Sequence, residues 1–456
     1  MDTLNLGILS SEISKRRLNV LRSPKKGGSS DFDSIPYLQE LGIEIGEGRQ
    51  PIQFTSNITE HIHRWAPYVQ GFSASFVQSI FKKYESEYIL PRVLDPFAGC
   101  GTVLVEAKFN GFESVGTELN PLLQFLADVK LNSWDVSPNY FLKTYYELSK
   151  EKRSFAPEYL KSRSHFKDSL LKNLEIIKGG IDAIEPKTDK QKKVKNLLLL
   201  AFSSILIDCS NMKRTPCLGY WKDKILYDKM PFAVFDKKIR EIAADLTEIQ
   251  SSYNHLINIP SKIILADAMK YNHEFKYDLI ITSPPYMNGL DYVINYKIEM
   301  GWLGFVSSQN ELKKIKDNMV VCDNVSKGLI KKFSKDKKFY TNQWLDTIKS
   351  DIIKNIRTRG GYRRQDMPNI VHKYFDDIYK VMRNVVSSMN FKGRFILVVG
   401  DSLIADVYIP TDLMIAKIGE ELGLKIGSIE KARNRRSGQI RSYKLRESII
   451  TLKKDY

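Results

Sequence analysis

Short apolar runs alternate with helical segments along much of the chain. The candidate strands lie at 92–95, 114–118, 262–267, 277–282 and 395–400. Runs of this length, rich in β-branched residues, are typical of strands buried on both faces of a parallel sheet. Apolar positions at helical spacing occur in 102–110, 374–389 and 411–422. The alternation predicts an α/β fold.

The last two candidate strands, 424–429 and 448–452, are joined by a connection of hairpin type. A hairpin joins antiparallel neighbours, so at least one of these strands should run against the others. We therefore expect a sheet of about seven strands that is mostly parallel and has an antiparallel last strand. Two Lys-rich helical stretches, 130–260 and 307–357, show no such alternation and are interpreted as insertions.

Composition adds a strong positive charge. The 456 residues include 70 Lys and Arg against 53 Asp and Glu, which gives a formal net charge of +17. This balance favours a polyanionic partner, and a merely basic soluble protein is the alternative. The four cysteines lack CxxC spacing and the six His are scattered, so we expect neither a metal site nor a disulfide framework.

No segment of the sequence has the pattern of a membrane anchor. Residues 1–6 lack a basic start followed by an apolar core, so no signal peptide is expected. The longest apolar stretch, 197–207, is interrupted by Ser203 and Ser204 and is too short to span a bilayer. With the unpaired cysteines, these features predict a protein of the reducing cytoplasm without a membrane partner.

The first candidate site is the segment 95–102, Asp-Pro-Phe-Ala-Gly-Cys-Gly-Thr, at the end of a strand. Its Gly-x-Gly lets the backbone turn tightly and approach a ligand closely. Three carboxylates close three strands: Asp95 could take an ammonium group, Glu118 two ribose hydroxyls and Asp267 an adenine amine. Each alone could be an ordinary strand-end or helix-cap acid. Together with the glycines, they favour a site for a nucleotide-type cofactor.

The second candidate site is the segment 282–286, Thr-Ser-Pro-Pro-Tyr, which also follows a strand. Two consecutive prolines remove two N–H donors and stiffen the loop, which leaves the neighbouring carbonyls free as acceptors. The Ser283 oxygen and one such carbonyl could accept both N–H bonds of an exocyclic amine. Tyr286 could stack on the ring that bears the amine, an interaction of about 1–3 kcal/mol per base. An ordinary rigid turn is the alternative.

Together, the two segments resemble the amino-group DNA methyltransferases that use S-adenosylmethionine. The Ser-Pro-Pro-Tyr form resembles the enzymes that act on cytosine N4, whereas Asp-Pro-Pro-Tyr is more typical of adenine N6. The resemblance covers about 60–128, 262–305 and 373–455. It implies a Rossmann-like methyltransferase sheet and double-stranded DNA as the substrate, from which the target base must flip out of the stack.

The resemblance also assigns roles to individual residues. The expected S-adenosylmethionine-binding residues are Asp95, Pro96, Phe97, Gly99, Gly101, Thr102, Glu118, Asp267 and Ala268. The expected catalytic and base-binding residues are Ser283, Pro284, Pro285 and Tyr286. The biological setting implied is a prokaryotic restriction–modification system, with a cognate restriction endonuclease acting on the same site as a candidate partner.

The chain then divides into six parts. They are an N-terminal extension (1–55), the cofactor-binding half (56–129), a helical insertion and candidate target-recognition region (130–260), the catalytic half (261–306), a basic helical insertion that is a candidate DNA-contacting region (307–372), and the C-terminal part of the sheet (373–456).

Three other functions compete with this reading. A cytosine C5 methyltransferase needs a thiolate nucleophile, and Pro216-Cys217 is a Pro-Cys pair, but it follows no strand of the α/β pattern. An RNA or protein amide methyltransferase is the second rival, although the protein-glutamine enzymes usually carry Asn in place of Ser283. The third is a DNA-binding protein with a degenerate methyltransferase fold, which the intact glycines, Glu118 and Ser283 argue against.

Two clusters of arginine are candidate phosphate contacts. The predicted DNA-binding residues are Arg357, Arg359, Arg363 and Arg364 in the first cluster, and Arg433, Arg435, Arg436 and Arg441 in the second. The second cluster is expected in the connection between the last two strands. Basic loops at the ligand edge of a sheet are well placed to hold phosphates, and a solvated basic loop is the alternative for each cluster.

Overall fold

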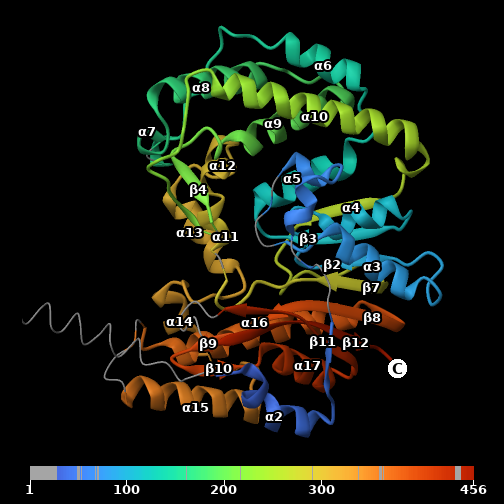
Figure 1. Ribbon diagram of the computed structural model, residues 1–456, viewed down its shortest axis with the longest axis vertical. Helices are drawn as coiled ribbons and strands as arrows, with labels where there is room; N and C mark the ends of the chain where they lie inside the picture. Colours follow the sequence, from blue (N-terminus) through green and yellow to red (C-terminus); the bar gives the residue numbers. More distant parts are fainter. Residues whose placement is uncertain are drawn as a thin grey trace, which may run out of the picture.

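The computed structural model describes residues 28–48, 52, 54–66, 68, 71–160, 162–215, 217–289, 291–336, 338–358, 362, 364–436 and 443–455. Its centre is an eight-stranded sheet in the order β1-β11-β12-β8-β7-β2-β3-β6 (Figure 1). The strands are β1 (Ile45–Glu47), β2 (Val93–Asp95), β3 (Ser114–Glu118), β6 (Ser261–Leu265), β7 (Tyr277–Thr282), β8 (Met389–Gly400), β11 (Lys425–Arg436) and β12 (Lys444–Lys453). Strand β12 runs antiparallel to both neighbours, and the other pairs of this sheet are parallel. The predicted α/β sheet with an antiparallel last strand is confirmed.

Both faces of the sheet are buried, as the continuous apolar runs predict. On β7, Leu279 and Ile281 pack into one core cluster, while Ile280 packs into the other. On β8, Ile396 joins the first cluster and Leu397 the second. Because successive side chains of a strand point to opposite faces, each apolar run supplies two cores at once.

Helices cover both faces of the sheet (Figure 1). The first core cluster includes side chains of α3 (Ala74–Tyr84), α4 (Thr102–Phe109) and α5 (Pro121–Asn132). The second includes side chains of α2 (Ser30–Leu41), α15 (Gln343–Thr358), α16 (Met367–Ser387) and α17 (Thr411–Glu421). Helix α3 begins where the Ser73 side chain accepts a hydrogen bond from Phe76 N, and α4 begins at Gly101, whose φ of +85° favours glycine.

The insertion 130–260 is a helical layer at the β6 end of the sheet, at the top of Figure 1. It contains α6 (Pro138–Tyr146), α7 (Ser162–His165), α8 (Asp168–Asp182), α9 (Asp189–Ile205) and α10 (Met230–Ser252), with a hairpin of β4 (Met212–Arg214) and β5 (Leu218–Tyr220). Apolar side chains of α8, α9 and α10 belong to the same core cluster as α4 and α5. The insertion therefore shares the core of the α/β unit.

A buried aspartate on α10 fixes the segment that precedes α3. Asp245 accepts hydrogen bonds from Trp65 Nε1 (2.8 Å) and Ile62 N (3.1 Å), and it also pairs with His61 and Arg64. Burial alone would raise the pKa of Asp245, but the hydrogen bonds from Arg64 and His61 hold that pKa below its usual value. Helix α10 thus holds the chain segment that leads into α3.

The remaining α-helices and strands come between β7 and β11 in the sequence. They are α11 (Tyr292–Asn295), α12 (Lys297–Trp302), α13 (Gln309–Asn318), α14 (Lys327–Phe333) and a small hairpin of β9 (Ser402–Ile404) and β10 (Val407–Ile409). Among the described residues, no helix is both long enough and apolar enough to cross a membrane.

The structure departs from the expectation in two places. The N-terminal part supplies an eighth strand, β1, which pairs with β11 at the sheet edge. The expectation of a basic loop between the last strands is wrong for Arg433, Arg435 and Arg436, which lie inside β11 and pair with residues of β12. Pairing with β12 satisfies their backbone groups, and the cross-strand partner Glu447 also offsets the charge of Arg433.

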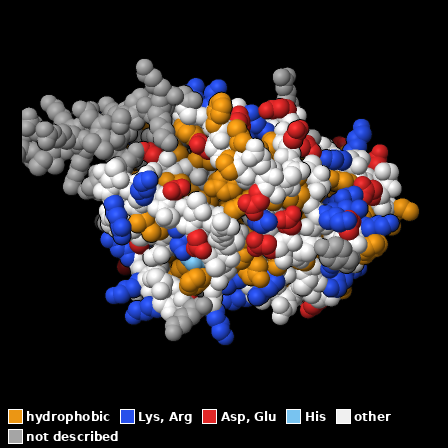
Figure 2. All heavy atoms as spheres, turned by 90° about the horizontal axis from the view of Figure 1, so that it is seen from below, with side chains coloured by type: hydrophobic (Ala, Val, Ile, Leu, Met, Phe, Trp, Pro, Cys, Tyr) orange, Lys and Arg blue, Asp and Glu red, His pale blue; other side chains and the backbone are white. Residues whose placement is uncertain are grey.

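Figure 2 shows the face of the molecule seen from below in Figure 1, on the side of α2 and α15. Lys and Arg side chains lie mainly around its margins, while acidic and apolar side chains mix in its centre. On this face, the side chains drawn in colour form no single basic patch. The excess positive charge of the chain is therefore not concentrated here.

Candidate active site

The two sequence motifs meet at one edge of the sheet. Strand β2 lies between β7 and β3, and β3 pairs with β6, so the loops that follow these four strands are neighbours. They surround an open pocket of about 570 Å³, a volume that includes adjoining solvent. Its lining residues are Tyr68, Pro96, Phe97, Glu118, Leu119, Ala266, Asp267, Ala268, Met269, Ser283, Pro285, Tyr292, Asn318, Met319 and Val320.

Asp95 connects the two motifs and does not line this cavity. Its Oδ1 accepts hydrogen bonds from Thr282 Oγ1 (2.6 Å) and from Phe97 N (3.0 Å). The side chain is buried, and the burial raises the pKa of Asp95 to about 7. Since Thr282 directly precedes Ser283, Asp95 sets the position of the Ser-Pro-Pro-Tyr segment relative to the glycine loop.

Glu118 holds the glycine loop from the end of β3. Its Oε2 accepts from Gly99 N (2.9 Å), and its Oε1 accepts from Asn120 N (2.8 Å). Burial raises the pKa of Glu118 to about 7. Gly99 has a φ of +53°, and a Cβ atom there would lie 3.1 Å from the Tyr68 ring, so the loop requires glycine at this position.

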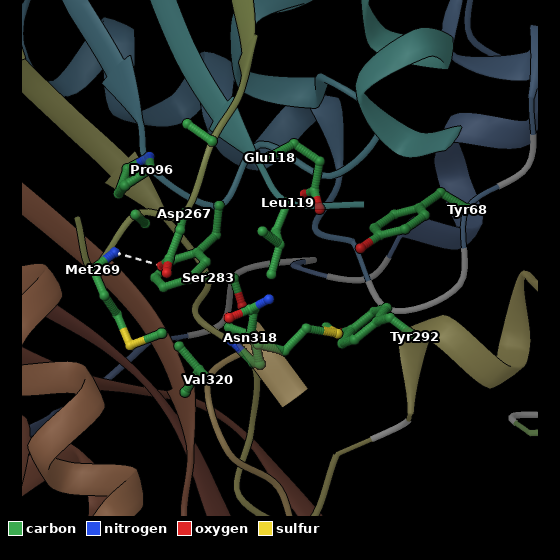
Figure 3. A pocket seen from close by; sticks show the side chains of 15 residues that line it. Tyr68, Pro96, Glu118, Leu119, Asp267, Met269, Ser283, Tyr292, Asn318 and Val320 are labelled. Carbon is green, nitrogen blue, oxygen red and sulfur yellow. Dashed lines mark hydrogen bonds between the residues drawn. The ribbon is translucent and has the colours of Figure 1, made fainter. Parts of the chain in front are cut away.

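Asp267 lies at the opposite end of the cavity (Figure 3). Its Oδ1 accepts from Met269 N at 3.0 Å. Oδ2 is buried and forms an ion pair with the exposed Lys270, whose Nζ lies 2.8 Å away, but it accepts no aligned hydrogen bond from the described residues. Asp267 and Met269 line one end, and Glu118 and Tyr68 line the other (Figure 3).

The segment after β7 is held by hydrogen bonds from other strands and helices. Ser283 Oγ donates to Val398 O (3.1 Å), and Pro285 O accepts from Tyr374 OH (3.0 Å). Tyr286 OH donates to Glu447 Oε1 at 2.9 Å. Burial raises the pKa of Tyr286 well above its usual value, so the phenol stays protonated and neutral. The segment is therefore a rigid loop whose orientation is fixed from β8, β12 and α16.

Several cavity residues carry no motif in the sequence. Tyr68 stacks with Tyr292 and Tyr296 at ring-centroid distances of 6.3 and 6.0 Å, and forms an aromatic wall. Met319 and Val320 reach the cavity from the insertion 307–372. Tyr68 lies within the segment 60–128 that the family resemblance covers, whereas nothing in the sequence marks Met319 and Val320.

The structure separates the predicted DNA-binding arginines by environment. Arg357 and Arg436 are exposed. Arg364 pairs with Asp366. Arg433 pairs with Glu447, and Arg435 lies over the Tyr286 ring. Arg359, Arg363 and Arg441 lie outside the described residues, as does Pro216 of the Pro-Cys pair. No group of three or more His, Cys, Asp or Glu that could hold a metal ion occurs in the described part of the chain.

Comparison with known proteins gives a consistent set of relatives. No protein-family model matches the chain. The Type II methyltransferase M.AvaI of Nostoc sp. is 26% identical over 437 residues, which cover 86% of this chain and 85% of the relative. M.BsoBI of Geobacillus stearothermophilus is 23% identical over 458 residues, covering 89% and 88%. M.MvaI of Kocuria varians is 23% identical over 410 residues, covering 84% and 86%.

Among solved structures, the rRNA methyltransferase aviRa of Streptomyces viridochromogenes superposes with a TM-score of 0.30 at 9% identity, covering 89% of this chain and 94% of that one. The curated homologues of this chain are thus Type II methyltransferases, and the likeness extends over 84–89% of its length.

Proposed function

We propose that the protein transfers a methyl group from S-adenosylmethionine to an exocyclic amine of a flipped base in double-stranded DNA, with cytosine N4 as the target atom. The observation that carries the proposal is the shared cavity, in which Ser283 and Pro285 lie beside Glu118 and Asp267. The homologues are Type II methyltransferases, which supports DNA as the substrate. Adenine N6 is the alternative target, since both bases present an amine to such a site.

The cavity residues fit the proposed cofactor. Asp267 Oδ2 has no aligned hydrogen-bond donor, and its ion-pair partner Lys270 is exposed, so this oxygen can accept from the amine of adenine. An ionised carboxylate has about four lone-pair sites, so Glu118 can hold two backbone N–H groups and still accept from ribose hydroxyls. The Tyr68 ring closes the end where the methionine part would lie, next to Gly99. Bound S-adenosylmethionine supplies a methyl group on a sulfonium, already activated for transfer.

The catalytic segment orients the amine that is to be methylated. Because Ser283 Oγ donates its proton to Val398 O, its lone pairs are free to accept an N–H of the amine. A carbonyl of the Pro284-Pro285 pair accepts the second N–H. Both contacts aim the nitrogen lone pair at the methyl group, which is a proximity effect. Serine is too weak a base to remove the proton first, so the proton leaves late, to water.

The β4–β5 hairpin of the insertion 130–260 reaches the wall of this cavity. Arg214 Nε donates to Asn295 O (2.9 Å), and the guanidinium pairs with Glu299. The guanidinium carbon of Arg214 also lies 4.4 Å from the ring centroid of Tyr296, and the Tyr296 ring stacks on Tyr68. The hairpin is therefore anchored to the aromatic wall of the cavity.

The surface next to this anchor combines aromatic and basic side chains. Tyr220 is 62% exposed and Trp221 is 43% exposed. Lys213 and Lys224 lie with their Nζ atoms 5.3 and 6.0 Å from the Trp221 ring. Exposed aromatic rings flanked by lysine are typical of nucleic-acid contacts. We therefore place target recognition in the insertion 130–260, with this hairpin against the DNA.

The homology also supports a biological setting. Type II methyltransferases of bacteria are the relatives of the chain. We propose that the protein acts in the cytoplasm of a prokaryote, with a cognate restriction endonuclease that acts on the same DNA site as its partner.

A Ser283→Ala variant tests the catalytic assignment. We expect it to bind S-adenosylmethionine like the wild type and to lose methyl transfer to DNA, because one acceptor of the amine is gone. Ser251→Ala, on the exposed end of α10, is the matched control and should keep full activity. Methyl transfer at the wild-type rate by Ser283→Ala would refute the role of Ser283.

A further inference from the structure

The side chain of Arg435 lies beside the catalytic tyrosine, although its place in a basic cluster predicts a phosphate contact. The guanidinium carbon is 5.1 Å from the centroid of the Tyr286 ring. Its Nη2 donates to Asp401 O at 2.9 Å. A Cβ atom at Gly400 would lie 2.8 Å from Arg435 Cζ and 3.0 Å from Tyr286 Cε2. The glycine therefore leaves the space in which the guanidinium and the ring meet.

One donor of this guanidinium has no partner. The Nε–H of Arg435 is buried, and no described residue accepts a hydrogen bond from it. A buried donor without an acceptor costs free energy, so such a group in a native fold calls for an explanation. A ligand that brings its own acceptor next to Tyr286 would satisfy it.

Glu447 helps to hold the Tyr286 ring and the β11 arginines in place beside each other. Glu447 accepts from Tyr286 OH through Oε1 and pairs with Arg433 through Oε2. Arg433 and Arg435 are two residues apart on β11, so their side chains leave the same face of the strand. Arg436, which points to the opposite side, is exposed. The two arginines that face the catalytic segment are thus held by protein groups, and the exposed one is not.

We propose that Arg435 donates to the target base itself, and that its guanidinium selects cytosine. This inference rests on the proposed methylation of a DNA base. Cytosine carries two acceptors in sequence beside its amine, N3 and O2, whereas adenine carries N1 followed by a C–H. Nη2 of Arg435 carries two N–H bonds, and Asp401 O takes one of them. The other N–H of Nη2 and the unpaired Nε–H form the fixed fork of a guanidinium, which matches two neighbouring acceptors and not one.

The test separates a base contact from a phosphate contact. Arg435→Met is compared with the wild type in methyl transfer to phage DNA prepared from a methylase-free host, and in DNA binding across a salt series. We expect the rate at saturating DNA to fall about tenfold or more, since a bidentate base contact is lost, and the salt dependence of DNA binding to stay unchanged.

Two variants on the same strand calibrate these readouts. Arg436→Met should reduce the slope of log affinity against log salt by about one, the sign of a lost phosphate contact. Lys425→Met, at the far end of β11, should change neither the rate nor the slope. A wild-type rate for Arg435→Met, or a slope reduced by about one with the rate kept, would overturn the inference.

Arg435→Lys keeps the test valid if the methionine variant does not fold, which its melting temperature reports. Lysine keeps the charge but not the fork, so the rate should still fall about tenfold, and a wild-type rate would overturn the inference. Methylated adenine N6 as the wild-type product would overturn the selection of cytosine. If the wild type methylates no DNA, the proposed function itself fails; if it methylates DNA and Arg435 variants match it, the inference alone fails.

Discussion

Replacing Glu118 by Gln perturbs the cofactor end of the cavity at one atom. The carboxylate accepts from Gly99 N (2.9 Å) and Asn120 N (2.8 Å), and glutamine can keep only one of these contacts, because its amide nitrogen is a donor. A hydrogen bond to a charged group contributes about 1.5–3 kcal/mol. We therefore expect S-adenosylmethionine to bind roughly 10- to 100-fold more weakly at pH 8.

The pH dependence of S-adenosylmethionine binding tests the role of Glu118 independently. Burial raises the pKa of Glu118 to about 7, so the free protein holds this carboxyl largely protonated at pH 6 and ionised at pH 8. Because the ionised form is the acceptor, wild-type affinity should rise about tenfold from pH 6 to pH 8 on account of Glu118. The pKa of Asp95 is also about 7. The Glu118→Gln variant should therefore keep any pH dependence of affinity that comes from Asp95 and lose the part that comes from Glu118.

Isothermal titration calorimetry with S-adenosylmethionine at pH 6, 7 and 8, at constant ionic strength, measures both effects. Glu113→Gln is the matched control, because Glu113 is an exposed partner of Arg92 outside the cavity. Binding by Glu118→Gln within about threefold of the wild type at pH 8, or with the full pH dependence of the wild type, would contradict the role of Glu118.

Three further changes test other parts of the structure. Asp245→Asn should lower the free energy of unfolding by about 1–3 kcal/mol in urea titrations at pH 7, because the partly exposed Arg64 loses its charged hydrogen-bond partner. The pKa of Asp245 is lowered in the fold, so this difference should shrink as the pH falls through that pKa, and a constant difference would contradict the assignment. Thr282→Val removes the donor to Asp95 and should lower stability by about 1–3 kcal/mol, more at pH 8 than at pH 6, since Asp95 ionises near pH 7. Trp221→Ala should weaken DNA binding in fluorescence anisotropy by about tenfold while cofactor affinity stays unchanged; unchanged DNA affinity would exclude the hairpin from the interface.

The sequence predicts the sheet well because its strands are local and buried on both faces. The runs at β7 and β8 have the composition that such burial demands. Strand β1 is different: its three residues, Ile45–Glu47, carry no pattern, and they form a strand only because β11 lies beside them. A contact between residues so far apart in sequence has no local signature.

The basic segment before residue 437 shows how charge can hide a strand. Arg433, Arg435 and Arg436 suggest a solvated loop by composition, yet β11 extends through them because β12 provides partners. Their roles then follow from alternation along the strand, which places Arg435 at Tyr286 and Arg436 in solvent. Only the register, which is a tertiary property, distinguishes them.

The candidate site divides in the same way. Strand-end carboxylates could be placed at one edge of the sheet from the sequence, since parallel strands end together. The sequence could not show that Asp95 accepts a hydrogen bond from Thr282, because that bond joins residues 187 positions apart. It also could not show that Met319 and Val320 close the cavity, since they come from an insertion without a motif.

The central claim is that the protein methylates an exocyclic amine in DNA, and the product nucleoside tests it most directly. Unmethylated duplex DNA is incubated with the protein and S-adenosylmethionine carrying a deuterated methyl group, then digested to nucleosides and analysed by mass spectrometry. RNA and protein incubated in parallel serve as competing substrates. We expect the label in N4-methylcytosine. Label in adenine N6 would contradict the assigned base, and label only in RNA or protein, or none at all, would contradict the claim itself.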